Sequence, residues 1–412
     1  MQTKVPFYRP EVGELEIQEV VAALRSGWLT TGPRVKRFEE SFAAAVGAPH
    51  AVALNSCTAA LHLAVHALGV RPGDGVLVPA MTFAATAEVV RYEGGIPILI
   101  DCDPHTLGMD LQHAERTVER LKSGVPPAGL QKNVPVVGLI PVHVGGQMMD
   151  VEAIKAFAVR HNLWVVEDAA HAFPAAWRRS PEEPWQQCGQ QTAAVSCFSF
   201  YANKTITTGE GGMAVTDNAE LAARIRLLSL HGLSHDAWGR YSVNGSWDYR
   251  ILVPGYKYNL TDIAAAIGIH QLARAEDMRR TREAIAQEYR QRLAEVDELE
   301  LPPVDENRIH AWHLFPIRLR LETLVMDRDS FMSELARAGV SCSVHWRPLH
   351  LHPYYEDTFG WRPDDLPVAS AVWPRLVSLP IFSNMASHEI DAVVSAVRAL
   401  CGRSSRRLAA TR

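Results

Sequence analysis

The stretch FSFYANKTITTGEGGM at residues 198–213 places Lys204 between aromatic and hydroxyl side chains and a glycine-rich turn. Short apolar runs, Ala193–Phe198 and Met213–Val215, flank it and have the length of buried strands. A lysine whose pKa is lowered by such surroundings can form a Schiff base with an aldehyde and, once released, move protons. A surface lysine before a turn is the other interpretation, and this stretch alone leaves both open.

A second segment, WVVEDAAH at residues 164–171, is an apolar strand that ends in two acids. Asp168, at the carboxyl end of this strand, can pair with a protonated ring nitrogen. In a pyridoxal phosphate enzyme, that pairing keeps the ring able to accept electrons. The alternative is that Asp168 caps the next helix.

Two more segments follow predicted strands. LNSCTAA, at residues 54–60, can cap a helix and leave backbone N–H groups free to hold a phosphate or carboxylate, or it can be an ordinary cap. Phe83, in PAMTF at residues 79–83, can stack on a flat ring or belong to the core.

Strands and helices alternate over residues 50–216, which predicts an α/β fold with a large, mostly parallel sheet covered on both faces. The remaining predicted strands are Ala51–Leu54, Val76–Pro79, Pro97–Ile100, Val134–Val142 and Trp164–Glu167. The predicted helices are Ala59–Leu68, Ala84–Arg91, Val151–His161 and Ala219–Leu228. Ligands of such sheets bind beyond the carboxyl ends of the strands, so the four segments are expected to form one pyridoxal phosphate site.

The remaining sequence predicts a second, smaller domain. A helical pattern runs from Thr261 to about Ala294, followed by a proline-containing hinge at Leu301–Asn307. A strand, a helix and another strand are predicted after it, at Trp312–Leu319, Arg328–Ala338 and Ser341–His345. We therefore expect a large domain over residues 1–260, a connecting helix over 261–300, a small α/β domain over 301–402 and a frayed, disordered tail over 403–412.

Composition excludes several classes of protein. The chain has 412 residues and a formal net charge of −5, which disfavours nucleic-acid binding through bulk positive charge. No apolar run is long enough to cross a bilayer, so we expect no membrane-spanning helix. The six cysteines form no C-x-x-C pair, and His345, His350 and His352 are loosely spaced, so no disulfide framework and no metal are expected. Residues 1–10 lack the apolar core of a signal peptide, and the expected location is cytoplasmic.

With these segments in view, the sequence resembles the DegT/StrS-type sugar aminotransferases. The matching pieces are NSCTAALHLA (55–64), PGDGVLVPAMTFAATAE (72–88), PVHVGG (141–146), VVEDAAHA (165–172) and the lysine stretch at 198–213. The resemblance implies the aspartate-aminotransferase-like fold, type I among pyridoxal phosphate enzymes. It also implies transfer of the amino group of L-glutamate to a nucleotide-linked keto-sugar, through the pyridoxal and pyridoxamine forms of the cofactor.

The resemblance also implies roles for individual residues. Lys204 would form the Schiff base and Asp168 would pair with the pyridine nitrogen. Phe83 would stack on the ring, and His171 would lie near the 3′-oxygen of the cofactor. The implied phosphate-binding residues are Ser56, Cys57, Thr58, Ala59 and Ser199.

Further implied residues serve a homodimer with shared active sites. In GYKYNLTD, at residues 255–262, Lys257 stands where most members have Asn and Asn259 where most have Arg. In the family this loop reaches the cofactor phosphate of the neighbouring subunit. The implied substrate-binding residues are Trp28, Thr30, Thr31 and His313.

The form of this loop, together with His171 and HAWHLF at 310–315, is most similar to the UDP-4-amino-4-deoxy-L-arabinose aminotransferase branch. The stretch 177–191, which contains Trp185, looks longer than usual and could reshape the acceptor pocket.

Two other functions stay open. One is an aromatic-amine synthase of the same family, such as an aminohydroxybenzoate synthase, whose acceptor carries no nucleotide. The other is a regulator that binds the cofactor without turnover. The dehydratases of the family carry His in place of the Schiff-base lysine, so Lys204 disfavours that branch.

Overall fold

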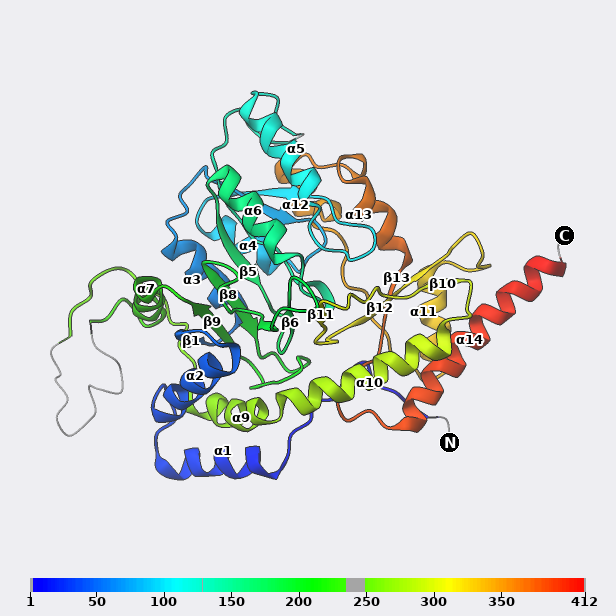
Figure 1. Cartoon of the computed structure of the whole chain (residues 1–412), viewed down its shortest axis with the longest axis horizontal. Coiled ribbons are helices and arrows are strands. Elements are labelled where there is room, and N and C mark those ends of the chain that lie inside the picture. The colour runs from blue at the N-terminus through cyan, green and yellow to red at the C-terminus, as the bar shows by residue number, and fades with distance from the viewer. Residues whose placement is uncertain (1–2, 128, 235–248, 411–412) are drawn as a thin grey trace.

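A large mixed sheet forms the centre of the molecule (Figure 1). The computed structural model describes residues 3–127, 129–234 and 249–410. The strands of this sheet are β1 (His50–Leu54), β2 (Gly75–Pro79), β3 (Ile96–Ile100), β4 (Val136–Leu139), β5 (Trp164–Asp168), β8 (Val195–Ser199) and β9 (Gly212–Thr216). Each overlaps one of the apolar runs predicted as a strand, so the predicted α/β fold is confirmed.

The strand order of the sheet is β1-β9-β8-β5-β4-β2-β3. Within this sheet β9 pairs antiparallel with both β1 and β8, whereas the other neighbouring strands pair in parallel. The carboxyl ends of β1, β2, β5 and β8 therefore lie along one edge, where an α/β sheet binds its ligands.

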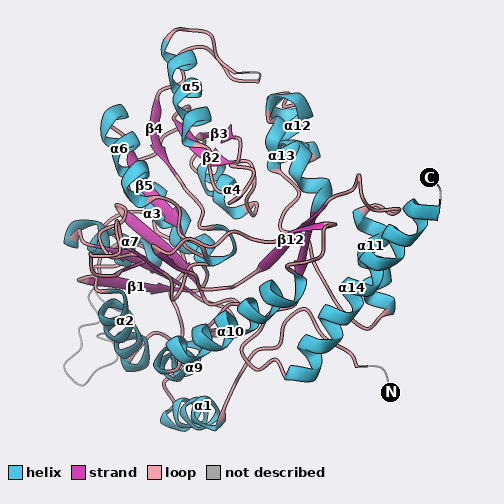
Figure 2. Ribbon diagram, turned by 45° about the vertical axis from the view of Figure 1, so that its right-hand side comes forward, coloured by secondary structure: helices cyan, strands magenta, loops and turns pink. Residues whose placement is uncertain are grey.

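Helices cover both faces of the sheet, as Figure 2 shows. Side chains alternate along a strand, so Val76 and Val78 join the core beneath α3 and α4, whereas Leu77 joins the core beneath α5 and α6. The helices around this sheet are α1 (Glu14–Ser26), α2 (Pro33–Val46), α3 (Cys57–Ala67), α4 (Ala85–Tyr92), α5 (Leu111–Lys122), α6 (Val151–His161) and α7 (Ala219–Ser229). The four helices predicted in this region are confirmed to within two residues at each end.

The predicted helix over 261–294 is two helices, α9 (Asp262–Ala273) and α10 (Ala275–Leu293). The chain leaves helical geometry at Arg274, where φ is −109° and ψ is 5°. This break lets α9 pack on α1 and α2 while α10 continues to the second core, where it buries Tyr289 and Leu293. Arg274 binds Glu16, a buried carboxylate of α1, at 2.5 Å.

A smaller sheet, in the order β10-β12-β13, has a hydrophobic core of its own. Its strands are β10 (Leu299–Glu300), β12 (Phe315–Leu319) and β13 (Leu376–Leu379), and α11 (Arg328–Arg337) and α14 (Ser387–Ala410) pack against it. The strand predicted at Ser341–His345 is wrong, because this segment forms only an isolated bridge between Ser343 and Ser378. The predicted frayed tail at 403–412 instead continues α14 as far as Ala410 (Figure 1).

The remaining elements are short. A third sheet, in the order β11-β6-β7, joins β11 (Arg308–Ile309), β6 (Ala176–Trp177) and β7 (Gln186–Gln187). Two further helices are α12 (Pro353–Phe359) and α13 (Pro367–Val372), and 3-10 turns lie at Val144–Gly146, Leu349–Leu351, Pro363–Asp365 and Trp373–Arg375. Among the described residues, no helix combines the length and apolar character that crossing a membrane requires.

Candidate active site

A cavity of about 470 Å³ opens at the carboxyl ends of β1, β2, β5 and β8. Residues predicted from the sequence line it from several strands at once. They are Ser56, Cys57, Thr58, Phe83, Asp168, His171, Ser199, Lys204 and His313. Segments that lie far apart in the chain thus meet in one space.

The N-terminus of α3 forms the anion-binding end of this cavity. Ser56 has an extended backbone, and its Oγ accepts a hydrogen bond from the Ala59 N–H at 3.0 Å, which starts the helix at Cys57. The N–H groups of Cys57 and Thr58 donate to no described residue. Free N–H groups and the positive end of the helix dipole attract a phosphate or carboxylate. Ala59, predicted as a phosphate contact, uses its own N–H for the cap.

Gly212 allows the start of β9 to lie directly beside this turn. A Cβ atom at position 212 would lie 2.3 Å from the carbonyl carbon of Ser56 and 2.5 Å from the Cys57 nitrogen. Only glycine permits this approach of two backbones, so β9 supports the N-terminus of α3.

Asp168 is the last residue of β5 and its side chain is buried at the cavity wall. Its Oδ2 accepts a hydrogen bond from the Thr86 hydroxyl at 2.7 Å, and its Oδ1 accepts one from the Ala170 N–H at 3.1 Å. Burial raises the pKa of Asp168, although these hydrogen bonds and the charge of Lys204 oppose the shift. It forms no salt bridge within the described residues, so a cationic ring nitrogen would supply the missing partner charge.

Lys204 follows β8, and its amine points into the cavity wall formed by His313. Lys204 Nζ lies 3.4 Å from His313 Nε2. Burial lowers the pKa of Lys204 to about 8. The same burial, together with the charge of Lys204, holds the pKa of His313 well below its ordinary value. Lys204 is therefore the titrating group of this pair near neutral pH, and its neutral form is a nucleophile and a base.

His171 lies against His313, with ring centroids 4.2 Å apart. Its Nδ1 accepts a hydrogen bond from the Gly145 N–H at 3.3 Å, so its Nε2 carries the proton. Burial lowers the pKa of His171 well below the usual range, and the ring stays neutral. His171 can therefore donate one hydrogen bond without adding charge to the site.

Phe83 is 61% exposed at the cavity, so the alternative that it belongs to the core is wrong. An exposed ring beside a buried acid and a lysine is suited to covering one face of a flat ligand.

Two parts of the site were not predicted from the sequence: the cavity wall formed by residues 344–346, and Thr86, which donates a hydrogen bond to Asp168. Val344, His345 and Trp346 line the site, and Trp346 stacks on His171 with ring centroids 5.2 Å apart. Val344 and His345 belong to the segment predicted as a strand and Trp346 follows it, and no local pattern marked them. Thr86 could have been found, because it stands three residues after Phe83 at the start of a predicted helix.

Besides Ala59, five predicted residues do not line this cavity: Trp28, Thr30, Thr31, Lys257 and Asn259. All of them except Thr30 form a separate network, in which Lys257 Nζ donates to Asn259 Oδ1 at 2.5 Å and Asn259 Nδ2 donates to Thr31 Oγ1 at 2.7 Å. The Trp28 indole N–H donates to the Thr31 carbonyl at 3.0 Å.

The stretch 177–191 also stays away from the Lys204 cavity. Trp185 carries the Arg178 guanidinium over its ring at 4.4 Å and lines another cavity, beside α10. Within one chain the segment therefore does not shape the space around Lys204.

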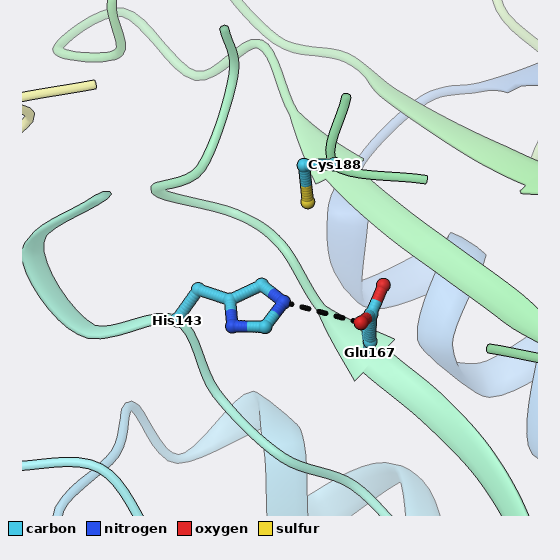
Figure 3. Close-up of side chains that lie close together, drawn as sticks. All are labelled: His143, Glu167 and Cys188. Carbon is cyan, nitrogen blue, oxygen red and sulfur yellow. Dashed lines mark ion pairs between the residues drawn. The ribbon is translucent and has the colours of Figure 1, made fainter. Parts of the chain in front are cut away.

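A buried cluster of His143, Glu167 and Cys188 lies at the end of β5 (Figure 3). Glu167 and Asp168 are neighbours in β5, so their side chains point to opposite sides of the strand. The Met149 N–H donates to His143 Nδ1 at 3.2 Å, so the proton of the neutral ring is on Nε2, which lies 3.3 Å from Glu167 Oε1. A protonated nitrogen cannot ligate a cation, and Glu167 also accepts hydrogen bonds from Thr192 and Ser196. We interpret the cluster as a hydrogen-bonded support for the end of β5 rather than as a metal site.

The Lys204 cavity has the chemistry to hold a ligand that combines an anionic group, a flat cationic ring and an electrophilic carbon. Free N–H groups suit the anion, Asp168 suits the ring nitrogen, Phe83 suits the ring face, and Lys204 suits the carbon.

Comparisons with known proteins agree with this chemistry. The profile of the DegT/DnrJ/EryC1/StrS aminotransferase family matches residues 10–398. The spore coat polysaccharide biosynthesis protein SpsC of Bacillus subtilis is 43% identical over 395 residues, which cover 96% of each chain. Spr1654 of Streptococcus pneumoniae, solved in its PLP form, is 30% identical with a TM-score of 0.84, over 98% of this chain and 100% of that one. The sugar aminotransferase CalS13 of Micromonospora echinospora is 28% identical with a TM-score of 0.80, over 96% of this chain and 99% of that one.

Proposed function

Because the chain belongs to the DegT/DnrJ/EryC1/StrS aminotransferase family, we propose that it moves the amino group of L-glutamate to a nucleotide-linked 4-keto-sugar in the cytoplasm. The family and its relatives make the protein a pyridoxal phosphate-dependent sugar aminotransferase. The donor, the nucleotide, the position of the keto group and the location are the parts that this proposal adds.

The residues of the cavity fit the cofactor. The free N–H groups of Cys57 and Thr58, together with the Ser199 hydroxyl, would hold its phosphate. Asp168 would keep its pyridine nitrogen protonated, and Phe83 would cover one face of the ring. When bound, the cofactor supplies an electron-accepting ring that stabilises negative charge on the carbon of the substrate that loses its proton.

Lys204 would carry the cofactor covalently and, when released by the amine of the donor, would move the proton. A pKa of about 8 leaves part of the population uncharged at neutral pH, ready to accept the proton from the donor Cα. His313, held neutral 3.4 Å away, does not compete for that proton. The observation that carries the proposal is that Lys204 and Asp168, both buried, line the same cavity.

We further propose a homodimer in which Lys257 and Asn259 reach the cofactor phosphate of the partner subunit. Within one chain these two residues are hydrogen-bonded to each other and lie outside the Lys204 cavity. Trp28, Thr30 and Thr31 belong to the same proposal, as substrate-binding residues that act across the dimer.

A spectroscopic half-reaction tests the proposal. The purified enzyme is converted to its pyridoxamine form with L-glutamate, the donor is removed, and UDP- and dTDP-linked 4-keto-sugars are added one at a time. We expect the absorbance of the lysine-bound cofactor to return with one of these sugars. Return only with a keto-acceptor that lacks a nucleotide would favour the aromatic-amine synthase instead. An absorbance that L-glutamate never bleaches would contradict the proposed donor.

A further inference from the structure

Residues 256–259 form an extended segment whose side chains alternate between two sides. The rings of Tyr256 and Tyr258 stack 5.0 Å apart with an angle of 12° between their planes. Lys257 and Asn259 are bonded to each other, so they share the other side. The backbone of the segment is held on both edges, because the Tyr258 N–H donates to the Ser229 carbonyl and the Tyr258 carbonyl accepts from the Asn55 N–H.

One buried histidine lies beneath the tyrosine side of this segment. His62, on α3, is 4% exposed, and its ring centroid is 4.8 Å from that of Tyr256 and 5.8 Å from that of Tyr258. His62 Nδ1 lies 3.2 Å from the Tyr258 hydroxyl, and His62 Nε2 lies 2.8 Å from Glu93 Oε1.

Glu93 fixes the direction of these hydrogen bonds. A carboxylate only accepts, so Nε2 of His62 carries the proton and Nδ1 accepts from the Tyr258 hydroxyl. Glu93 Oε1 also accepts from His66 Nδ1, at 3.0 Å, on the same side of α3. Burial lowers the pKa of His62, which keeps the ring in the neutral form that this arrangement needs. Each hydrogen bond of this chain therefore has one direction: the Tyr258 hydroxyl donates to His62, and His62 donates to Glu93.

We propose that His62, held by Glu93, is a positioning residue that fixes residues 256–259 so that Lys257 and Asn259 are presented to the cofactor of the partner subunit. This inference rests on the shared active sites of the proposed function. One helix then serves two sites. The first turn of α3 would hold the phosphate in the cavity of its own subunit. His62, in the next turn, would position residues 256–259, which reach the cavity of the partner subunit.

A hydroxyl deletion tests the hydrogen bond without removing a ring. Tyr258→Phe keeps the stack with Tyr256 and loses only the bond to His62. Tyr92→Phe is the matched control, because the Tyr92 ring also packs on His62, at 5.2 Å, while its hydroxyl bonds Glu88 and not the loop. The measurement is the dissociation constant of pyridoxal phosphate, from the absorbance of the lysine-bound cofactor. We expect about fivefold weaker binding for Tyr258→Phe, as for one lost hydrogen bond, and no change for Tyr92→Phe.

Mixed dimers show in which subunit His62 acts. In the first, one subunit carries His62→Ala and the other carries Lys204→Ala. The only site that can link the cofactor then receives its loop from a subunit with an intact His62. In the second, one subunit is unchanged and the other carries both substitutions, so the only competent site receives a loop that lacks His62. The reference pairs an unchanged subunit with Lys204→Ala.

We expect cofactor affinity of the first mixed dimer to equal the reference and that of the second to be roughly tenfold weaker. Two results would overturn the inference. One is weaker cofactor affinity in the first mixed dimer, in which His62→Ala and the intact Lys204 are in the same subunit. The other is equal affinity in the two mixed dimers. If His62→Ala does not fold, Tyr258→Phe replaces it in the same design. Failure of the proposed function is seen separately, because the unchanged protein would then form no dimer or no lysine-bound cofactor.

Discussion

Lys204 owes its reactivity to where the chain buries it. An ordinary lysine stays charged until pH values above 10, whereas burial lowers the pKa of Lys204 to about 8. The neighbouring rings of His313 and His171 are held neutral by the same burial, so they add no charge that would compete.

The protein without cofactor should therefore link pyridoxal phosphate at a rate that rises with pH and levels off above about pH 8. The sign follows from the lowered pKa, because the neutral amine that attacks the aldehyde predominates above that value. Stopped-flow absorbance at a series of pH values measures the rate. A rate that keeps rising toward pH 10.5, the ordinary value for lysine, would show that Lys204 is not perturbed. Lys204→Ala is the control and should show no such phase.

Asp168→Asn should lower turnover by about 100-fold or more, because an amide cannot stabilise a positive charge on the ring nitrogen. Thr86→Val removes only the hydrogen bond to Asp168 Oδ2 and should cost about five- to tenfold. Steady-state kinetics on cofactor-saturated enzyme measure both effects. Equal activity of Asp168→Asn and the unchanged enzyme would remove Asp168 from the proposed chemistry.

The sequence predicts the residues whose role can be inferred from their immediate neighbours in the chain. Lys204, Asp168 and the first turn of α3 each follow a strand within a short, recognisable segment. His345 and Trp346 do not, since they reach the cavity from a segment far beyond Lys204 in the chain, and only the tertiary fold brings them there.

Among the elements, α3 supplies the anion-binding end of the site, and its N-terminus depends on one glycine of the neighbouring strand. At Gly212 there is no room for a methyl group between β9 and the backbone of Ser56. Two elements therefore build the anion-binding end of the cavity: the N-terminus of α3 and strand β9, which lies directly beside it.

Gly212→Ala should lower the free energy of unfolding by about 2–3 kcal/mol, as overpacking does, and weaken cofactor binding at least tenfold. Gly402→Ala is the matched control, because a Cβ at position 402 of α14 meets no atom within 4 Å. That change should be neutral or stabilise by up to about 1 kcal/mol. Chemical denaturation and cofactor titration measure the two effects, and a Gly212→Ala protein as stable and as tightly loaded as the control would contradict the close approach.

Hydrophobic pattern predicted the elements of the large sheet because its strands are buried on both faces. The hydrophobic pattern did not predict two features that depend on tertiary contacts. The helical periodicity runs through Arg274, yet the helix breaks there, where Arg274 pairs with buried Glu16 and α10 continues into a second core. The segment predicted as a strand at Ser341–His345 lines the cavity with Val344 and His345, and β13 takes the place beside β12.

For the whole molecule, the central feature is that the sites implied by the sequence are split between two places on the chain. One group surrounds Lys204, and the other, around Lys257, lies outside that cavity. The proposed homodimer would bring both groups together in shared sites, and its interface would be two-fold.

Light scattering after size exclusion should therefore give twice the chain mass of 45.5 kDa. Lys257→Ala should leave that mass unchanged and weaken cofactor binding roughly tenfold, because one charge-assisted hydrogen bond to the phosphate is lost. Lys132→Ala is the control, because Lys132 is exposed and lines neither the Lys204 cavity nor the cavity that contains Thr31 and Asn259. A monomer with full activity would contradict the shared sites.

Sequence alone could establish the fold class and the family resemblance, but not the spatial relation of the two groups of residues. Contacts such as Asn259 to Thr31 join positions that are distant in the chain, and no periodicity or spacing encodes them.

The role of Lys204 is tested most directly by reducing the cofactor-loaded enzyme with borohydride, before and after L-glutamate, and mapping the modified peptide by mass spectrometry. We expect a pyridoxyl group on Lys204 before the donor is added and its loss after the donor converts the cofactor to the pyridoxamine form. Modification of a different lysine, or a Lys204 adduct that L-glutamate does not diminish, would contradict it.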